Sequence, residues 1–200
     1  SVTELFYSVG GHKADKHLRP EELSAVETGI KYALNGISAK ASVYWNHHKN
    51  LIDWINDGTL DANGAVLWKS VNFGNINDFG VETALDFDFQ QMFPSMRTLK
   101  KFSLAYNYIH QNKGEQAGIV SQYALEYLKN KLVANLQLNL YKHLDLGFYY
   151  RFLHRMGSYP DASNQRHEYA SYGIVDSRLS WTAQKWSAYV EANNLLNKHY

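Results

Sequence analysis

Alternating apolar and polar residues recur along most of this chain. In the segment KLVANLQLNLY, residues 131–141, leucine or alanine occupies every even position and mostly polar residues occupy the odd ones. Residues 81–89 and 144–152 alternate in the same way. Neighbours on one face of a helix lie three or four residues apart, so this period of two excludes helices there. The sequence therefore predicts an all-β chain.

Turn residues between the alternating segments divide the chain into nine predicted strands. They are expected near residues 1–9, 22–34, 37–55, 66–89, 99–110, 130–141, 143–155, 171–182 and 186–194. The strands at 37–55 and 66–89 are long enough to extend past a membrane.

The connections between these strands alternate between short and long. The short ones are 35–36, 142–143 and 183–185, with 90–98 intermediate, and the long ones are 10–21, 56–65, 111–129 and 156–170. An outer-membrane barrel has tight periplasmic turns at one end and long loops at the other. A soluble meander has no reason to keep its long loops at one end. We therefore expect an antiparallel up-and-down transmembrane β-barrel.

Both ends of the sequence suggest a piece of a larger barrel. Nine strands is an odd number, whereas bacterial single-chain barrels have an even one. The last strand leads into the turn-like residues 194–197 with no strand to return on, and the first residues lack the basic head and apolar core of a signal peptide. We expect a C-terminal portion that stops before its closing strand.

Composition excludes several functional classes. The net charge is +1 and neither sign forms a long block, which argues against a nucleic-acid binder. The chain has no cysteine, so disulfides, thiolate metal sites and cysteine nucleophiles are excluded. Its 15 tyrosines are typical of the aromatic belts of membrane barrels. Tyr149, Tyr150, Tyr159 and Trp45 could stack on a ligand, but we expect them to form such a belt, and we expect no cofactor.

Eight phrases resemble, in order and over nearly the whole chain, the β-barrel of TonB-dependent outer-membrane receptors. They are TELFYS (3–8), HLRPEELSAVETGIKY (17–32), ASVYWNHHKNLIDWI (41–55), VNFGNINDFGVETAL (71–85), LAYNYIHQ (104–111), SQYALEYLKNKL (121–132), YYRFLHRMGSY (149–159) and VDSRLSWTAQKWSAYVEANNLLNKHY (175–200). Residues 15–18, DKHL, depart from the family's usual NPNL in an outer loop.

The resemblance implies that residues 1–200 form about nine strands of a 22-stranded barrel, without the plug, the early strands and the closing strand. It implies a receptor in the outer membrane of a Gram-negative bacterium, with no enzymatic activity. Such a receptor imports a scarce nutrient complex, here cobalamin or a ferric siderophore, with energy coupled through TonB. The implied partners are TonB (through the absent N-terminal part), outer-membrane lipid and the small-molecule nutrient complex, with no nucleic acid.

Charged residues that alternate with apolar ones are expected to line the polar lumen of this barrel. They are Glu27, Lys40, Glu82, Asp86, Asp88, Asp145, Arg151, Arg178 and Glu191. Asp86 and Asp88 would lie about 6.6 to 7 Å apart on one face, a spacing also found between the catalytic carboxylates of inverting glycosidases. Because a polar lumen needs such side chains without any catalysis, we predict no catalytic residues and no metal site.

Histidines suggest an alternative cargo. His12 and His17 lie in the predicted outer loop 10–21, where heme importers of the resembled family often carry an axial histidine. Heme import through either residue is therefore an alternative to two solvated loop histidines. His47 and His48 are adjacent in a predicted strand, so they should point to opposite faces and cannot easily share one metal ion.

Two rivals belong to other classes. An outer-membrane barrel enzyme would need a serine–histidine pair near the outer interface, for which Ser171 and His154 are the candidates. A soluble β-sheet binding protein would need a second sheet to cover its apolar face.

Overall fold

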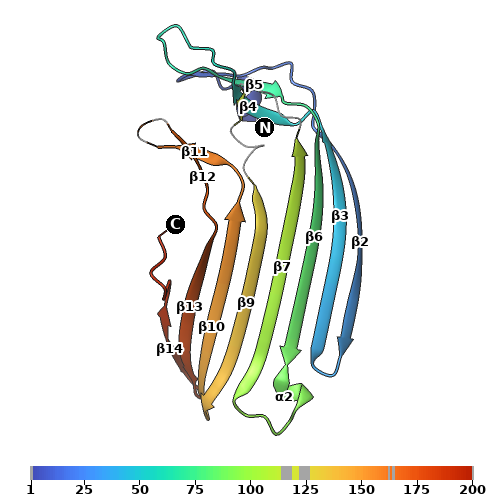
Figure 1. Cartoon of the computed structure of the whole chain (residues 1–200), viewed down its shortest axis with the longest axis vertical. Coiled ribbons are helices and arrows are strands. Elements are labelled where there is room, and N and C mark those ends of the chain that lie inside the picture. The colour runs from blue at the N-terminus through green and yellow to red at the C-terminus, as the bar shows by residue number, and fades with distance from the viewer. Residues whose placement is uncertain (1, 114–118, 122–126, 162, 164, 200) are drawn as a thin grey trace.

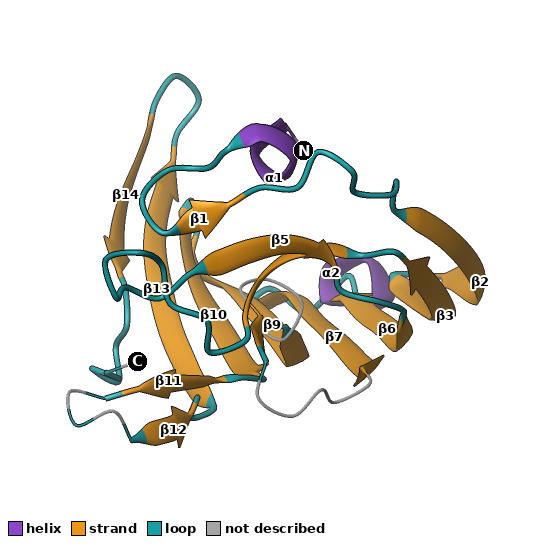
Figure 2. Ribbon diagram, turned by 90° about the horizontal axis from the view of Figure 1, so that it is seen from above, coloured by secondary structure: helices purple, strands orange, loops and turns teal. Residues whose placement is uncertain are grey.

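A curved antiparallel sheet of eight strands dominates the computed structural model, which describes residues 2–113, 119–121, 127–161, 163 and 165–199 (Figures 1 and 2). The strands lie in the order β14-β13-β10-β9-β7-β6-β3-β2. Their bounds are β2 Glu22–Leu34, β3 Ile37–Lys49, β6 Ile76–Asp88, β7 Leu99–Lys113, β9 Leu128–Tyr141, β10 Leu144–Arg155, β13 Tyr172–Thr182 and β14 Ser187–Ala192. The predicted all-β, antiparallel fold class is confirmed.

Three of the nine predicted strands differ from the structure. Residues 1–9 hold a short helix, α1 (Val2–Phe6), and no barrel strand. The segment 37–55 divides into β3 and β4 (Ile52–Asn56), and the segment 66–89 divides into β5 (Trp68–Asn72) and β6. Asn50 and Gly74 interrupt these strands with positive φ angles of 53° and 118°, which regular strands do not adopt.

The two ends of the sheet differ as the connection lengths predict (Figure 1). At the short-turn end, Asn35 and Gly36 both have positive φ, as in a type I′ hairpin. The four-residue helix α2 (Phe89–Met92) packs against this turn, where the Asp88 amide donates to the Gly36 carbonyl at 2.7 Å. A Cβ atom on Gly36 would lie only 2.7 Å from the Asp88 carbonyl oxygen, so glycine is required there.

At the long-loop end, the loops form a second, small sheet. Its order is β1-β5-β4-β8, with β1 at His12–Lys13 and β8 at Val120–Ser121. A separate hairpin pairs β11 (Ser158–Pro160) with β12 (Arg166–Glu168). Seen from above, β1 and β5 lie over the end of the curved sheet (Figure 2).

The apolar face of the large sheet stays exposed. Val43, Phe79 and Leu85, on the inner strands β3 and β6, are 42%, 44% and 39% exposed. The small sheet lies at the end of the strands and does not cover this face (Figure 1). The second covering sheet expected of a soluble binding protein is therefore absent from the described part of the chain. No helix among the described residues is long and apolar enough to cross a membrane.

The turn after the last strand is fastened to the neighbouring strand. The Asn194 amide donates to Asp176 Oδ1 at 2.8 Å, and the Leu195 amide donates to the Val175 carbonyl at 2.8 Å. The other carboxylate oxygen of Asp176 accepts from Arg151 Nη2 at 2.7 Å. The buried Asp176 carboxylate thus joins β10, β13 and the turn that follows β14.

We predict that Asp176→Ala loosens this turn. The substitution removes two hydrogen bonds to a charged acceptor, each worth about 1.5–3 kcal/mol. Amide hydrogen exchange at Asn194 and Leu195 in the intact barrel should accelerate at least about tenfold. Ser177→Ala, with its side chain on the opposite face, is the matched control and should leave both rates nearly unchanged. Equal rates in Asp176→Ala and the control would contradict the prediction.

Candidate functional site

Strand register places the nine predicted charged residues on one face of the large sheet. Glu82 lies opposite Ser42 of β3 and Asn107 of β7, and Arg178 lies opposite Gly147 and Glu191. Directly opposed residues in an antiparallel pair point to the same side. Following these pairs across the sheet gives one polar face that carries Glu27, Lys40, Glu82, Asp86, Asp88, Asp145, Arg151, Arg178 and Glu191.

Several of these charges are satisfied by neighbouring side chains. The pairs are Glu82 with Asn107 (2.9 Å), Asp88 with Lys101 (3.5 Å), Asp145 with Lys100 (2.8 Å) and Arg151 with Asp176 (2.7 Å). Asp88 also caps α2 by accepting from the Gln91 amide at 3.1 Å. These contacts give the carboxylates of Asp88 and Asp145 structural roles and provide no arrangement for acid–base chemistry.

Three charged partners in these pairs, Asp176, Lys101 and Lys100, were not predicted from the sequence. Asp176 and Lys101 follow the strand alternation, so the pattern itself could have found them. Lys100 could not be found in this way, because the register between β7 and β9 shifts between Leu99 and Lys101. A bulge of this kind breaks the period of two on which the reasoning depends.

Hollows lie along the polar face. One, of about 560 Å³, is bordered by residues of β2, β3, β6, β7, β9 and β10, among them Asp86, Ser103 and Tyr149. Another, of about 280 Å³, lies between Tyr149 and Arg178, whose guanidinium group is 3.7 Å from the centre of the Tyr189 ring. Hollows bordered by many adjacent strands indicate that the polar face is the concave side of the curve seen in Figure 2.

Only part of the predicted aromatic belt lies on the apolar face of the sheet. Tyr150 and Trp45 lie on the apolar face, opposite Val175 and Phe79. Tyr149 instead points to the polar face and borders both hollows, so its assignment to the belt is wrong. Tyr159 lies in the outer hairpin, where its ring contacts those of His167 and Tyr169.

The small outer sheet has a core of its own. Trp54 and Asp53 of β4 are fully buried, and the Ser121 hydroxyl of β8 donates to the Asp53 carboxylate. Buried Ser70 of β5 accepts from the Asp15 amide and donates to the Glu4 carbonyl, both at 2.7 Å. Residues far apart in the sequence are therefore held in one ordered layer above the polar face.

The structure separates the two candidate ligand histidines. The half-buried ring of His12 packs edge-on against Trp54, with centroids 5.0 Å apart, and against Tyr7 at 5.8 Å. Its Nδ1 lies 3.3 Å from the Gly10 carbonyl oxygen. His17 is exposed, and its backbone amide donates to Asp15 Oδ1. In the described part of the chain, His12 and His17 form no hydrogen bond or ring contact with each other.

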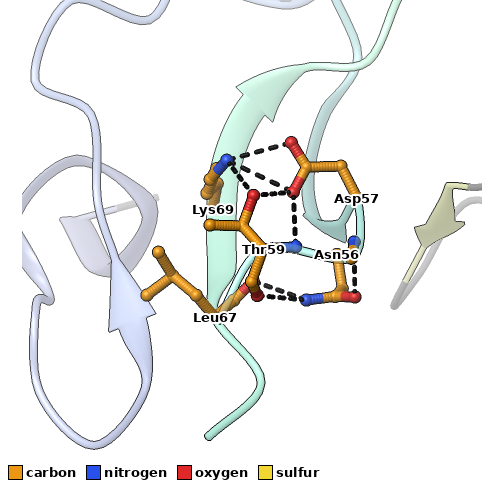
Figure 3. A network of polar contacts seen from close by, with 6 residues as sticks. Asn56, Asp57, Thr59, Leu67 and Lys69 are labelled. Atoms are coloured by element: carbon orange, nitrogen blue, oxygen red, sulfur yellow. Dashed lines mark hydrogen bonds and ion pairs between the residues drawn. The ribbon is translucent and has the colours of Figure 1, made fainter. Parts of the chain in front are cut away.

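A polar network stabilises the hairpin between β4 and β5 (Figure 3). Lys69 Nζ donates to both carboxylate oxygens of Asp57, at 3.2 and 2.9 Å, and to the Thr59 hydroxyl at 2.9 Å. Asn56 Nδ2 donates to the Leu67 carbonyl at 2.7 Å. Hydrogen bonds from Thr59, together with Lys69, hold the pKa of the Asp57 carboxyl well below its usual range. The charged form of Asp57 therefore stabilises this outer loop.

Two outer hairpins use the same aspartate motif. Asp61 Oδ1 accepts from the amides of Asn63 and Ala65, and Asp161 Oδ1 accepts from those of Ser163 and Gln165. In each hairpin the aspartate amide also donates to the carbonyl four residues later. Asp161 differs in that its Oδ2 contacts His167 Nε2 at 2.8 Å, and this bond lowers the pKa of the Asp161 carboxyl.

In the described part of the chain, His47, His48 and His154 form neither a metal centre nor a hydrogen bond to a serine. His47 contacts Asn77 at 2.7 Å and His48 contacts Asp78 at 3.0 Å, on opposite faces of β3. The described residues contain no group of three or more histidines and carboxylates that could hold a metal ion. His154 contacts Asn130 at 3.0 Å, whereas Ser171 is exposed in the loop before β13.

Comparisons with known proteins agree with this geometry. A family profile described as "TonB dependent receptor-like, beta-barrel" matches residues 1–195. No curated protein matches the sequence. Solved structures are similar in fold, among them the siderophore receptor PirA from Pseudomonas aeruginosa, with a TM-score of 0.66 and 18% identity over 94% of this chain.

Two further solved structures belong to the same set of similar folds. The ferric enterobactin receptor from Pseudomonas aeruginosa has a TM-score of 0.65 and 21% identity over 92% of this chain. The FrpB iron transporter from Neisseria meningitidis has a TM-score of 0.64 and 15% identity over 94%. This chain spans 29%, 27% and 28% of the lengths of these three proteins, respectively.

We predict that the Tyr44 ring requires glycine at position 80. A Cβ atom on Gly80 would lie 2.0 Å from Tyr44 Cζ, so Gly80→Ala must displace the ring. Overpacking of this kind costs about 1–3 kcal/mol. The unfolding free energy of the intact barrel in detergent should fall by this amount. In a Tyr44→Ala background the same change at Gly80 should cost little, and equal costs in both backgrounds would contradict the contact.

We also predict that acid loosens the β4–β5 hairpin. Folding lowers the pKa of the Asp57 carboxyl. The stabilisation of the hairpin by the charged carboxylate is therefore fully present above the usual pKa of 3.8. It is lost as the pH falls from 3.8 through the lower pKa of the folded state. Hydrogen-exchange protection of residues 56–69, corrected for intrinsic rates, should therefore fall below about pH 4. Asp57→Asn should show reduced protection already at pH 7 and no further loss in this window. Acid sensitivity that persists in Asp57→Asn would assign the effect to another group.

Proposed function

This chain belongs to the TonB-dependent receptor β-barrel family, and from that premise we propose that it supplies lumen wall and outer loops to an importer of scarce nutrient complexes. Members of the family are transporters of the Gram-negative outer membrane and not enzymes. One observation carries the proposal to this chain: a hollowed polar face lies beneath an ordered layer of outer loops.

In the proposed arrangement, the outer layer makes first contact with the cargo. His12 and His17 both lie in the loop before β2, so we assign them to this contact surface. The nine charged residues of the polar face would then line the lumen through which the cargo passes. Energy would come from TonB, acting through a part of the receptor outside this chain.

The proposed cargo is a ferric siderophore or cobalamin. The solved structures that support a ferric chelate are a siderophore receptor, a ferric enterobactin receptor and an iron transporter, all similar to this chain in fold. An ordered loop layer suits a large chelate, because loops that are already held in place lose little conformational entropy on binding.

We predict that the intact receptor in detergent binds ferric enterobactin or cyanocobalamin saturably, as measured by tryptophan fluorescence. His12→Ala and His17→Ala should each weaken binding about fivefold, the effect of one lost polar contact of about 1 kcal/mol. His143→Ala, at the opposite end of the sheet, is the matched control and should leave the affinity unchanged.

Hemin is the discriminating third ligand. A Soret shift that is lost in His12→Ala or His17→Ala would replace the proposed cargo with heme. If neither His12→Ala nor His17→Ala changes the affinity for the siderophore or cobalamin, the two histidines are not part of the contact surface. Binding of none of the three ligands would contradict the proposed cargo.

A further inference from the structure

We propose that a hollow at the short-turn rim of the barrel binds the phosphate head group of an anionic membrane phospholipid. The hollow lies between the connection that precedes β7 and the turn that joins β9 to β10, both at the lower end of the sheet in Figure 1. Its volume is about 650 Å³. This site is independent of the cargo and requires only that the barrel lies in a membrane.

The charge of the lining is the first argument. Arg97, Lys100 and Lys142 all border the hollow, and no aspartate or glutamate does. Lys100 is neutralised by Asp145 at 2.8 Å. Arg97 and Lys142 form no ion pair with any carboxylate in the described part of the chain. Two unpaired cations facing one hollow create a positive potential that suits a phosphate group.

This arrangement differs from that of two basic residues on the polar face. There, Lys101 and Arg151 both have a carboxylate partner within 4 Å. At the rim, Arg97 and Lys142 border one hollow without such a partner. An external anion would satisfy Arg97 and Lys142 in the same way that Asp88 and Asp176 satisfy the cations of the polar face.

The apolar residues around the hollow identify a lipid in preference to a free anion. Leu140 and Tyr141 line it and are 48% and 62% exposed, and Met96 on the facing connection is also exposed. Leu140 continues the apolar face of β9, whose Leu138 pairs with Leu146. An acyl chain could therefore extend along this face while Arg97 and Lys142 reach its head group, as basic side chains do at membrane interfaces.

The position of the hollow at the short-turn end indicates which membrane leaflet the lipid comes from. Short turns of outer-membrane barrels face the periplasm. The hollow therefore lies at the level of the inner leaflet, where basic side chains near the membrane surface attract anionic head groups. The Lys142 ammonium lies 5.3 Å from the centre of the Tyr141 ring, which keeps this cation beside the aromatic residue at the interface.

The test uses the intact receptor in detergent, titrated with dioleoyl phosphatidylglycerol, dioleoyl phosphatidylcholine or inorganic phosphate, with bound lipid counted by native mass spectrometry. We expect phosphatidylglycerol to bind most tightly. Arg97→Gln combined with Lys142→Gln should weaken it about 25-fold, at about fivefold per removed charge. Arg97→Lys keeps the charge and should stay within about twofold of the wild type.

The matched control removes two charges elsewhere, by Lys16→Gln and Lys185→Gln, and should retain the wild-type affinity. Heat modifiability on a gel verifies that each variant is folded. Equal phosphatidylglycerol affinity in the rim double variant and the wild type would overturn the proposal. A similar loss in the control would also overturn it, because the effect would then be one of net charge. Inorganic phosphate that binds as tightly as the lipid would overturn the lipid assignment.

Discussion

Strand register is the constraint on which the other features of this chain depend. Side chains alternate between the two faces of a strand, so a slip of one residue exchanges the faces completely. In a membrane barrel such a slip would carry Lys40, Arg151 and Arg178 into lipid, at about 2–4 kcal/mol for each basic residue at the bilayer midplane. The polar face, its hollows and the exposed apolar face all follow from this single choice of pairing.

The same constraint accounts for two ion pairs of the sheet and for the unpaired cations of the rim. Within the sheet, opposed and diagonal positions bring Arg151 to Asp176 and Lys101 to Asp88. At the rim, the bulge beside Lys100 ends the regular pairing. Arg97 lies outside β7, because it precedes Leu99, the first residue of that strand. Side chains outside the ladder have no partner assigned by register. The unpaired cations are therefore a consequence of where the sheet ends.

Sequence reasoning succeeded where one local pattern determines the structure. The alternation predicts β9 and β10 nearly to their ends, and it places nine charged residues that prove to share one face. It failed at Asn50 and Gly74, because single positive φ angles do not disturb the apolar pattern around them. It also could not show the outer sheet, in which β1 pairs with β5 more than 50 residues away. Such nonlocal pairing leaves no periodic signal in either segment.

That nonlocal pairing decides how the candidate ligand residues are presented. The Trp68 amide donates to the Gly11 carbonyl at 2.8 Å, and the side chain of Asn72 exchanges hydrogen bonds with the backbone of Arg19. The loop that carries His12 and His17 is thus held at both ends by β5, which is itself continued by a strand of the barrel wall. A contact surface held in this way is preorganised, so binding loses less conformational entropy than it would on a free loop. The loop at residues 10–21 can therefore be both long and ordered, because β5 determines its position.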